Sequence, residues 1–126
     1  MIQGPVSDWF VQALEENWCL ETSVNFEFDE DNPSSGQCVP TALIVQDVYG
    51  GNLVRGMCGD ASHYWNELPD GTEVDLTRQQ FGGKELVRDE YRTREYVLQD
   101  PLTRSRYILL KQKMILSFKE MMLSDA

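Results

Sequence analysis

The chain has 126 residues, of which 41% are hydrophobic and 25% are charged, a balance typical of one globular domain over residues 1–126. It carries 21 Asp and Glu residues against 11 Lys and Arg residues, a formal net charge of −10. Because an acidic surface repels phosphate groups, we expect no nucleic-acid partner. Every apolar run is far shorter than the roughly 20 residues that cross a bilayer, so we expect no membrane partner.

Cysteine and histidine are too sparse for a disulfide scaffold or for the common kinds of metal site. The three cysteines, Cys19, Cys38 and Cys58, lack the paired spacing of zinc sites, and the chain has one histidine. Residues 1–5 have neither the basic nor the apolar segment of a signal peptide. We therefore expect a cytoplasmic protein that uses no metal and no other cofactor.

The charges are unevenly distributed along the chain. Residues 1–37 hold eight carboxylates and no Lys or Arg, whereas residues 76–126 hold ten Lys or Arg residues and seven carboxylates. A segment whose charged side chains are all negative mostly serves solubility. Binding of a basic partner protein by the acidic segment remains open as an alternative.

The first part of the chain is predicted to form two helices joined by a polar loop. Ser7 is a suitable N-cap for a helix over residues 8–18, where apolar side chains recur at helical spacing. The loop over residues 27–35 is polar and contains proline. A second helix is predicted over residues 38–49, because Pro40 fits its first turn and a Gly-Gly pair follows its last turn.

The rest of the chain is predicted to alternate short strands with turns before a terminal helix. Extended segments are expected at residues 52–57, 62–68 and 72–76. A Pro-Asp-Gly turn at residues 69–71 indicates an antiparallel hairpin between the last two. The remaining elements are a turn or short helix over 77–83, a strand over 91–98 and a helix over 102–118. This order predicts an α+β fold.

Cys38, His63 and Asp75 are the best candidates for a chemical site. Unpaired N–H groups and the dipole of a helix N-terminus lower the pKa of a thiol, and Cys38 occupies such a position. In the predicted hairpin, positions near 65 and 74 lie opposite each other, so His63 and Asp75 become neighbours to within about one residue. The imidazole would then exchange a proton with the thiol while the carboxylate orients it. Each residue alone is more often structural, which keeps that interpretation open.

A series of short motifs extends along the chain: Gly36-Gln37-Cys38, Thr41-Ala42-Leu43-Ile44-Val45-Gln46-Asp47, Gly50-Gly51, His63-Tyr64-Trp65-Asn66, Leu68-Pro69-Asp70-Gly71, Asp75-Leu76-Thr77 and Gln80-Phe81. In order and spacing these motifs resemble the YunG-like family of small bacterial and phage proteins. The resemblance covers nearly the whole chain.

The resemblance implies a Cys, His, Asp order similar to that of papain-like and transglutaminase-like folds. In those folds a cysteine at the start of a helix packs on a sheet that carries the other two residues, so a small domain with its helix on a short antiparallel sheet is expected. The resemblance implies Cys38, His63 and Asp75 for catalysis and Gln37 for the oxyanion. Next to His63, Trp65 and Asn66 are candidates for substrate binding, although aromatic residues on a strand more often belong to the core.

Two functions remain as hypotheses. The first is a cysteine-dependent hydrolase or acyl-transfer enzyme of peptidase, deamidase or amidase type, acting on an unknown peptide, protein or amide substrate. The second is a non-catalytic protein-binding module, such as a phage or mobile-element factor with an acidic binding surface. They differ at Cys38, because an enzyme needs a partly exposed thiol with a lowered pKa, whereas a binding module would bury an inert one.

Overall fold

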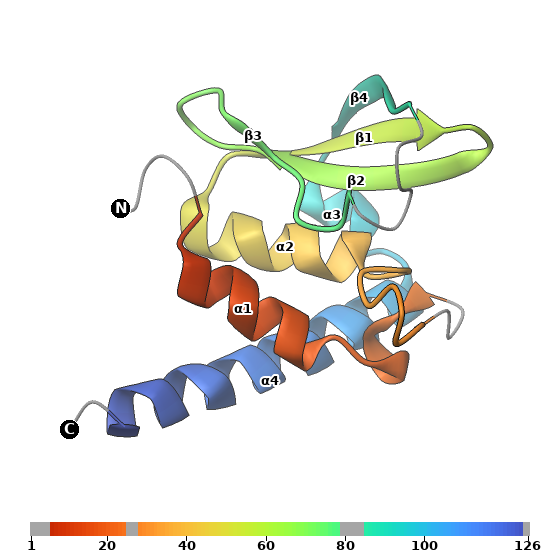
Figure 1. The fold of residues 1–126 in the computed structure, drawn as a ribbon. Helices are drawn as coiled ribbons and strands as arrows, with labels where there is room; N and C mark the ends of the chain where they lie inside the picture. The colour runs from red at the N-terminus through yellow and green to blue at the C-terminus, as the bar shows by residue number, and fades with distance from the viewer. Residues whose placement is uncertain (1–5, 25–27, 79–84, 125–126) are drawn as a thin grey trace.

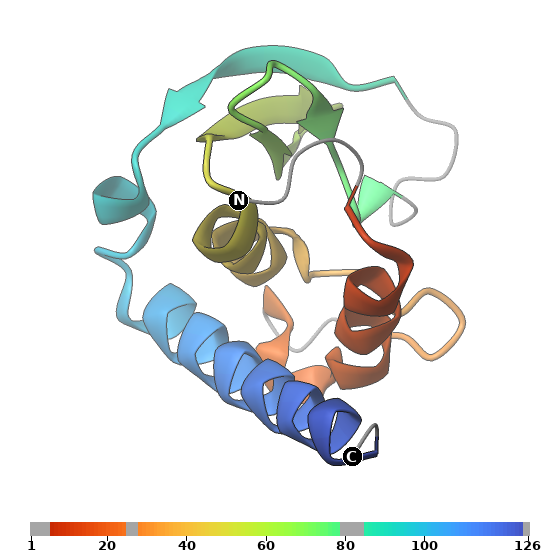
Figure 2. The ribbon, with the colours of Figure 1, turned by 90° about the vertical axis from the view of Figure 1, so that its left-hand side faces the viewer.

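Helix α2 (Cys38–Tyr49) lies in the middle of the molecule, between a β-sheet and the helices α1 (Asp8–Asn17) and α4 (Pro101–Ser124), as Figures 1 and 2 show. The structure is a computed structural model that describes residues 6–24, 28–78 and 85–124. A helix that is apolar on every side needs neighbours on every side. The buried residues of α2 are Pro40, Thr41, Ala42, Leu43, Ile44, Val45 and Tyr49.

The sheet is antiparallel and has the strand order β3-β2-β1-β4. Its strands are β1 (Asn52–Cys58), β2 (Ala61–Glu67), β3 (Glu73–Val74) and β4 (Val87–Arg92). Strands β1 and β2 pair along their whole length, from Asn52 opposite Glu67 to Cys58 opposite Ala61. The α+β class expected from the sequence is therefore confirmed.

All three long helices were predicted at nearly the right places. Helix α1 follows Ser7, and α2 has the predicted bounds. Helix α4 continues beyond residue 118 to Ser124, because its last residues include good helix formers such as Lys, Glu, Met and Leu. None of the described helices combines the length and the apolar character needed to cross a membrane.

The predicted hairpin after β2 is also confirmed, although its register differs by one residue from the expected pairing of positions near 65 and 74. Asn66 pairs with Val74 and Glu67 with Glu73, and Gly71 between them has a φ of 89°, which suits glycine. A second hairpin, between β1 and β2, was not predicted. It turns at Gly59, whose φ of 61° fits a two-residue hairpin turn.

The strand predicted over residues 91–98 is wrong in position. The strand ends at Arg92, and residues 94–97 form the short helix α3 (Arg94–Val97), capped by Thr93, whose side chain accepts the N–H of Tyr96 at 3.1 Å. Because five of the six β4 residues are exposed, the strand has no alternating apolar pattern to mark it. Most of the turn predicted over residues 77–83 lies outside the described residues.

Candidate active site

His63 and Asp75 meet because the hairpin turn folds β3 back against β2. Nε2 of His63 lies 2.7 Å from Oδ2 of Asp75. The other carboxylate oxygen, Oδ1, accepts the backbone N–H of Thr77 at 3.3 Å, which limits rotation of the carboxylate. Strand β3 pairs with only the last two residues of β2, so the chain leaves the sheet beside His63. The predicted pairing of these two residues is thus present.

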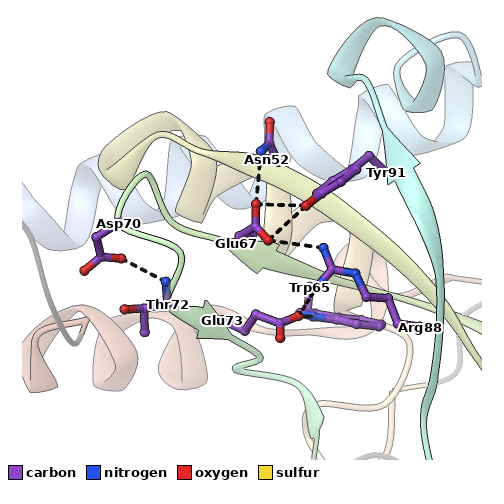
Figure 3. Close-up of polar contacts among 8 residues, drawn as sticks. All are labelled: Asn52, Trp65, Glu67, Asp70, Thr72, Glu73, Arg88 and Tyr91. Atoms are coloured by element: carbon purple, nitrogen blue, oxygen red, sulfur yellow. Dashed lines mark hydrogen bonds and ion pairs between the residues drawn. The ribbon is translucent and has the colours of Figure 1, made fainter.

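The imidazole of His63 is held by a ring contact as well as by its hydrogen bonds. His63 is 0% exposed, and its ring stacks on the Trp65 ring with 5.7 Å between centroids and 26° between planes. The indole N–H of Trp65 donates to Oε1 of Glu73 at 2.9 Å (Figure 3). A Cβ on Gly56, which pairs with His63, would lie 2.6 Å from the indole, so glycine is needed there. These contacts restrict the orientation of the imidazole.

Two opposing influences set the pKa of His63. Burial, the largest single influence, lowers the pKa because it disfavours the charged ring. Hydrogen bonds and Coulomb interactions with Asp75 and Cys38 outweigh burial and raise the pKa of His63 from 6.5 to about 9. Because Nε2 faces Asp75, Nδ1 is the nitrogen left for Cys38. His63 is therefore protonated at neutral pH and lies between a thiol and a carboxylate.

Cys38 is the first residue of α2 and is partly exposed, whereas Cys58 is buried in β1. Within the described part of the chain, the backbone N–H groups of Cys38 and Val39 have no acceptor. Two free N–H groups at the positive end of a helix dipole can receive an anionic oxygen. The thiol and these donors therefore share one end of α2.

A pocket of about 110 Å³ opens beside Cys38 between α2, β2 and α4. Its apolar wall consists of Val24, Val39 and Pro40, and its polar groups come from Ser62, Tyr64, Thr103 and Arg106. A second hollow of about 340 Å³ shares Val39, Tyr64 and Thr103 with this pocket and extends to α3. A larger apolar groove of about 530 Å³ lies between α1, α2 and α4 and contains neither Cys38 nor His63. A substrate at Cys38 can therefore extend from the small pocket into the hollow at α3.

Gln37, expected at the oxyanion, does not face the pocket. Its side chain is 0% exposed, its Oε1 accepts the Thr22 hydroxyl at 2.7 Å, and its Nε2 donates to the carbonyl of Cys19 at 3.0 Å. Both ends of the amide are thus used to fasten the start of α2 to the short helix η1 (Leu20–Thr22). This placement gives Gln37 a structural role in positioning Cys38.

The two expected substrate-binding residues of β2 are also buried. Asn66 is 2% exposed and donates to the carbonyl of Ala42 at 2.9 Å, so it joins the sheet to α2. Trp65 is 8% exposed and supports His63 instead of lining the pocket. The pocket is lined from β2 by Ser62 and Tyr64, which alternate with His63 along the strand.

Thr103 and Arg106 are pocket residues that the sequence analysis missed. They are three residues apart on α4 and therefore share one face of that helix. No local signal connects this face to Cys38, which lies more than sixty residues earlier in the chain. Among the described residues, no group of three or more His, Cys, Asp or Glu side chains is arranged to hold a metal ion.

Comparison with known proteins places the chain in a family. The family model described as "YunG protein" matches residues 7–119, a range that contains the pocket and the Cys38, His63 and Asp75 side chains. The "Uncharacterized protein YunG" of Bacillus subtilis (strain 168) is 34% identical over 68 residues, 54% of this chain and 56% of the relative, so the match spans little more than half of that protein. No solved structure matches the chain. The chain belongs to the YunG family.

Proposed function

We propose that this protein is a cysteine-dependent hydrolase or acyl-transfer enzyme. Cys38 is the nucleophile, His63 the acid and base, and Asp75 the group that orients His63. The observation that carries the proposal is the buried imidazole, which contacts a carboxylate through one nitrogen and a partly exposed thiol through the other. A raised histidine pKa beside a cysteine at a pocket is typical of a chemical site.

The reaction follows from the positions of these groups. The Cys38 thiolate attacks the carbonyl carbon of an amide or thioester, and the carbonyl electron pair moves to oxygen, where the N–H groups of Cys38 and Val39 receive the charge. His63 gives its proton to the leaving nitrogen or sulfur as that bond breaks. Neutral His63 then takes a proton from water, which attacks the acyl-thioester and releases an acid and the thiolate. In acyl transfer an amine replaces the water.

We also propose that the domain is a small relative of papain-like and transglutaminase-like enzymes. Support comes from the order Cys, His, Asp along the chain and from a helix that begins at the cysteine and packs on an antiparallel sheet. In this proposal the substrate is a peptide, a protein or a smaller amide, and part of it occupies the hollow at α3.

The test is alkylation by iodoacetamide over a range of pH, with mass spectrometry to measure the rate at each cysteine. Cys38 should react fast well below pH 8.5, roughly the pKa of a free thiol, and His63→Ala should abolish this reactivity. Leu53→Ala is the matched control, because it removes a buried side chain of the same sheet without touching the site. Thermal unfolding shows whether both variants are folded.

A chemical step is then sought with p-nitrophenyl acetate and short peptide thioesters. Intact-mass measurement should show one acyl group on the protein, absent in Cys38→Ser and retained in Cys58→Ser. If Cys38 reacts with iodoacetamide no faster than Cys19 or Cys58, or only after unfolding, the enzyme proposal is wrong. The alternative, a protein-binding module with an acidic surface, would then be preferred.

A further inference from the structure

Arg106 differs from the other arginines of the protein in its environment. It is half-buried and lines the pocket beside Cys38. Within residues 6–24, 28–78 and 85–124 its guanidinium has no hydrogen bond and no ion pair, whereas every other arginine there has an interaction partner. Burying a cation without a partner is unfavourable, and a chain with 21 Asp and Glu residues offers many possible partners. The guanidinium is therefore available to a group that enters the pocket.

The rest of the pocket suits a carboxylate. Besides the Arg106 guanidinium, the hydroxyl groups of Ser62, Tyr64 and Thr103 can donate hydrogen bonds to a bound group. None of the described lining residues is acidic. Arginine binds carboxylates through two parallel hydrogen bonds, a geometry that also fixes the position of the bound group. The apolar residues of the lining, Val24, Val39 and Pro40, can contact a short hydrocarbon chain.

We propose that Arg106 binds a carboxylate of the substrate, close to the carbonyl that Cys38 attacks. The inference rests on the proposed function of Cys38 and names its substrate class: amides or thioesters whose acyl group ends in a carboxylate, as in succinyl and glutaryl compounds. At about 110 Å³, the pocket is smaller than the roughly 300 to 1,000 Å³ of ordinary ligand sites, so it holds only this acidic end. The leaving group lies in the hollow at α3.

Iodoacetate and iodoacetamide test the inference without a known substrate. The two reagents differ only by a carboxylate in place of a carboxamide, and in both cases the thiolate forms an S–C bond as iodide leaves. The quantity measured is the iodoacetate rate divided by the iodoacetamide rate at Cys38, in the folded protein and in the chain unfolded in urea. This ratio should be at least about tenfold higher in the folded protein, because a charge-assisted hydrogen bond favours the anionic reagent.

Arg106→Gln should lower the ratio at Cys38 by about tenfold, and dividing by the iodoacetamide rate corrects for any change in the general reactivity of the thiol. Arg104→Gln is the matched control, since it removes the same charge from α4 at an exposed residue that donates to the Leu98 carbonyl and lies outside the pocket. Its ratio should equal that of the wild type. A ratio that is unchanged in Arg106→Gln overturns the inference, whereas slow alkylation of Cys38 by iodoacetamide in the wild type overturns the proposed function itself.

Discussion

His63 and Asp75 are twelve residues apart in sequence, yet Nε2 of the buried imidazole lies 2.7 Å from Oδ2 of the carboxylate. The pair depends on the register of one hairpin, in which Asn66 is opposite Val74. A shift of this register by one residue would turn the side chains of β3 to the other face of the sheet and move Asp75 away from the imidazole. The protonation of His63 is thereby linked to the fold.

The first prediction concerns stability and pH. The pKa of His63 is about 9 in the folded protein and 6.5 in a free histidine. Below pH 6.5 His63 is protonated in both the folded and the unfolded chain, and its contribution to the free energy of unfolding is fully present. As pH rises from 6.5 to 9 only the folded protein keeps the proton, and the free energy of unfolding should fall. At about 1.4 kcal/mol per pKa unit, the decrease amounts to a few kcal/mol. Urea unfolding at a series of pH values measures it.

Asp75→Asn should flatten this dependence, because the folded pKa of His63 falls when the carboxylate charge is removed. Asp70→Asn is the control, since it removes a carboxylate from the turn of the same hairpin without touching His63. Figure 3 shows Asp70 accepting the N–H of Thr72. Equal slopes in the wild type and Asp75→Asn between pH 6.5 and 9 would contradict the coupling.

The second prediction separates a structural from a catalytic role for Gln37. Gln37→Met keeps the size of the side chain but removes its two buried hydrogen bonds, with the Thr22 hydroxyl and the Cys19 carbonyl, so it should lower the free energy of unfolding by about 1 to 3 kcal/mol. Gln12→Met, at an exposed residue of α1, should change it by less than about 0.5 kcal/mol. If Gln37→Met keeps full stability and loses only Cys38 reactivity, Gln37 acts at the oxyanion after all.

Much of the fold could be predicted because local signals marked it. Proline in a first turn and a Gly-Gly pair after the last one give the bounds of α2, and so place Cys38 at its start. The Pro-Asp-Gly turn predicts the hairpin and so brings His63 near Asp75, although the observed register differs by one residue from the expected one. In both cases the chemistry depends on contacts within one element or between adjacent ones.

The rest could not be predicted because it depends on packing between distant segments. The side chain of Gln37 is polar, but its partners come from a helix that only the tertiary fold brings near. Arg106 reaches the Cys38 pocket because α4 crosses beneath α2, and nothing in the sequence of α4 indicates that crossing. Residue type thus indicated which side chains could act in a reaction, whereas tertiary packing determines which of them lie close together.

The third prediction concerns the support of His63 by Trp65. Gly56→Ala places a Cβ at 2.6 Å from the indole and 2.7 Å from the carbonyl of Val87, so either the ring or strand β4 must move. The free energy of unfolding should fall by about 1 to 3 kcal/mol, and alkylation of Cys38 should slow as the imidazole loses its stacking partner. Gly59→Ala is the control, because no atom lies within 4 Å of its Cβ and only the φ of 61° opposes it. It should leave Cys38 reactivity unchanged.

The last prediction concerns Asp47, a carboxylate of α2 that joins three helices. Its Oδ1 lies 2.9 Å from the Arg94 guanidinium of α3, and its Oδ2 accepts the hydroxyl of Tyr107 in α4. Asp47→Asn removes the charge that pairs with this half-buried arginine, so the free energy of unfolding should fall by about 1 to 3 kcal/mol. Asp60→Asn, at an exposed residue of the β1–β2 turn, should stay within about 0.5 kcal/mol of the wild type in the same urea titration. Equal effects of the two substitutions would mean that overall charge, rather than the contacts of Asp47, sets the stability.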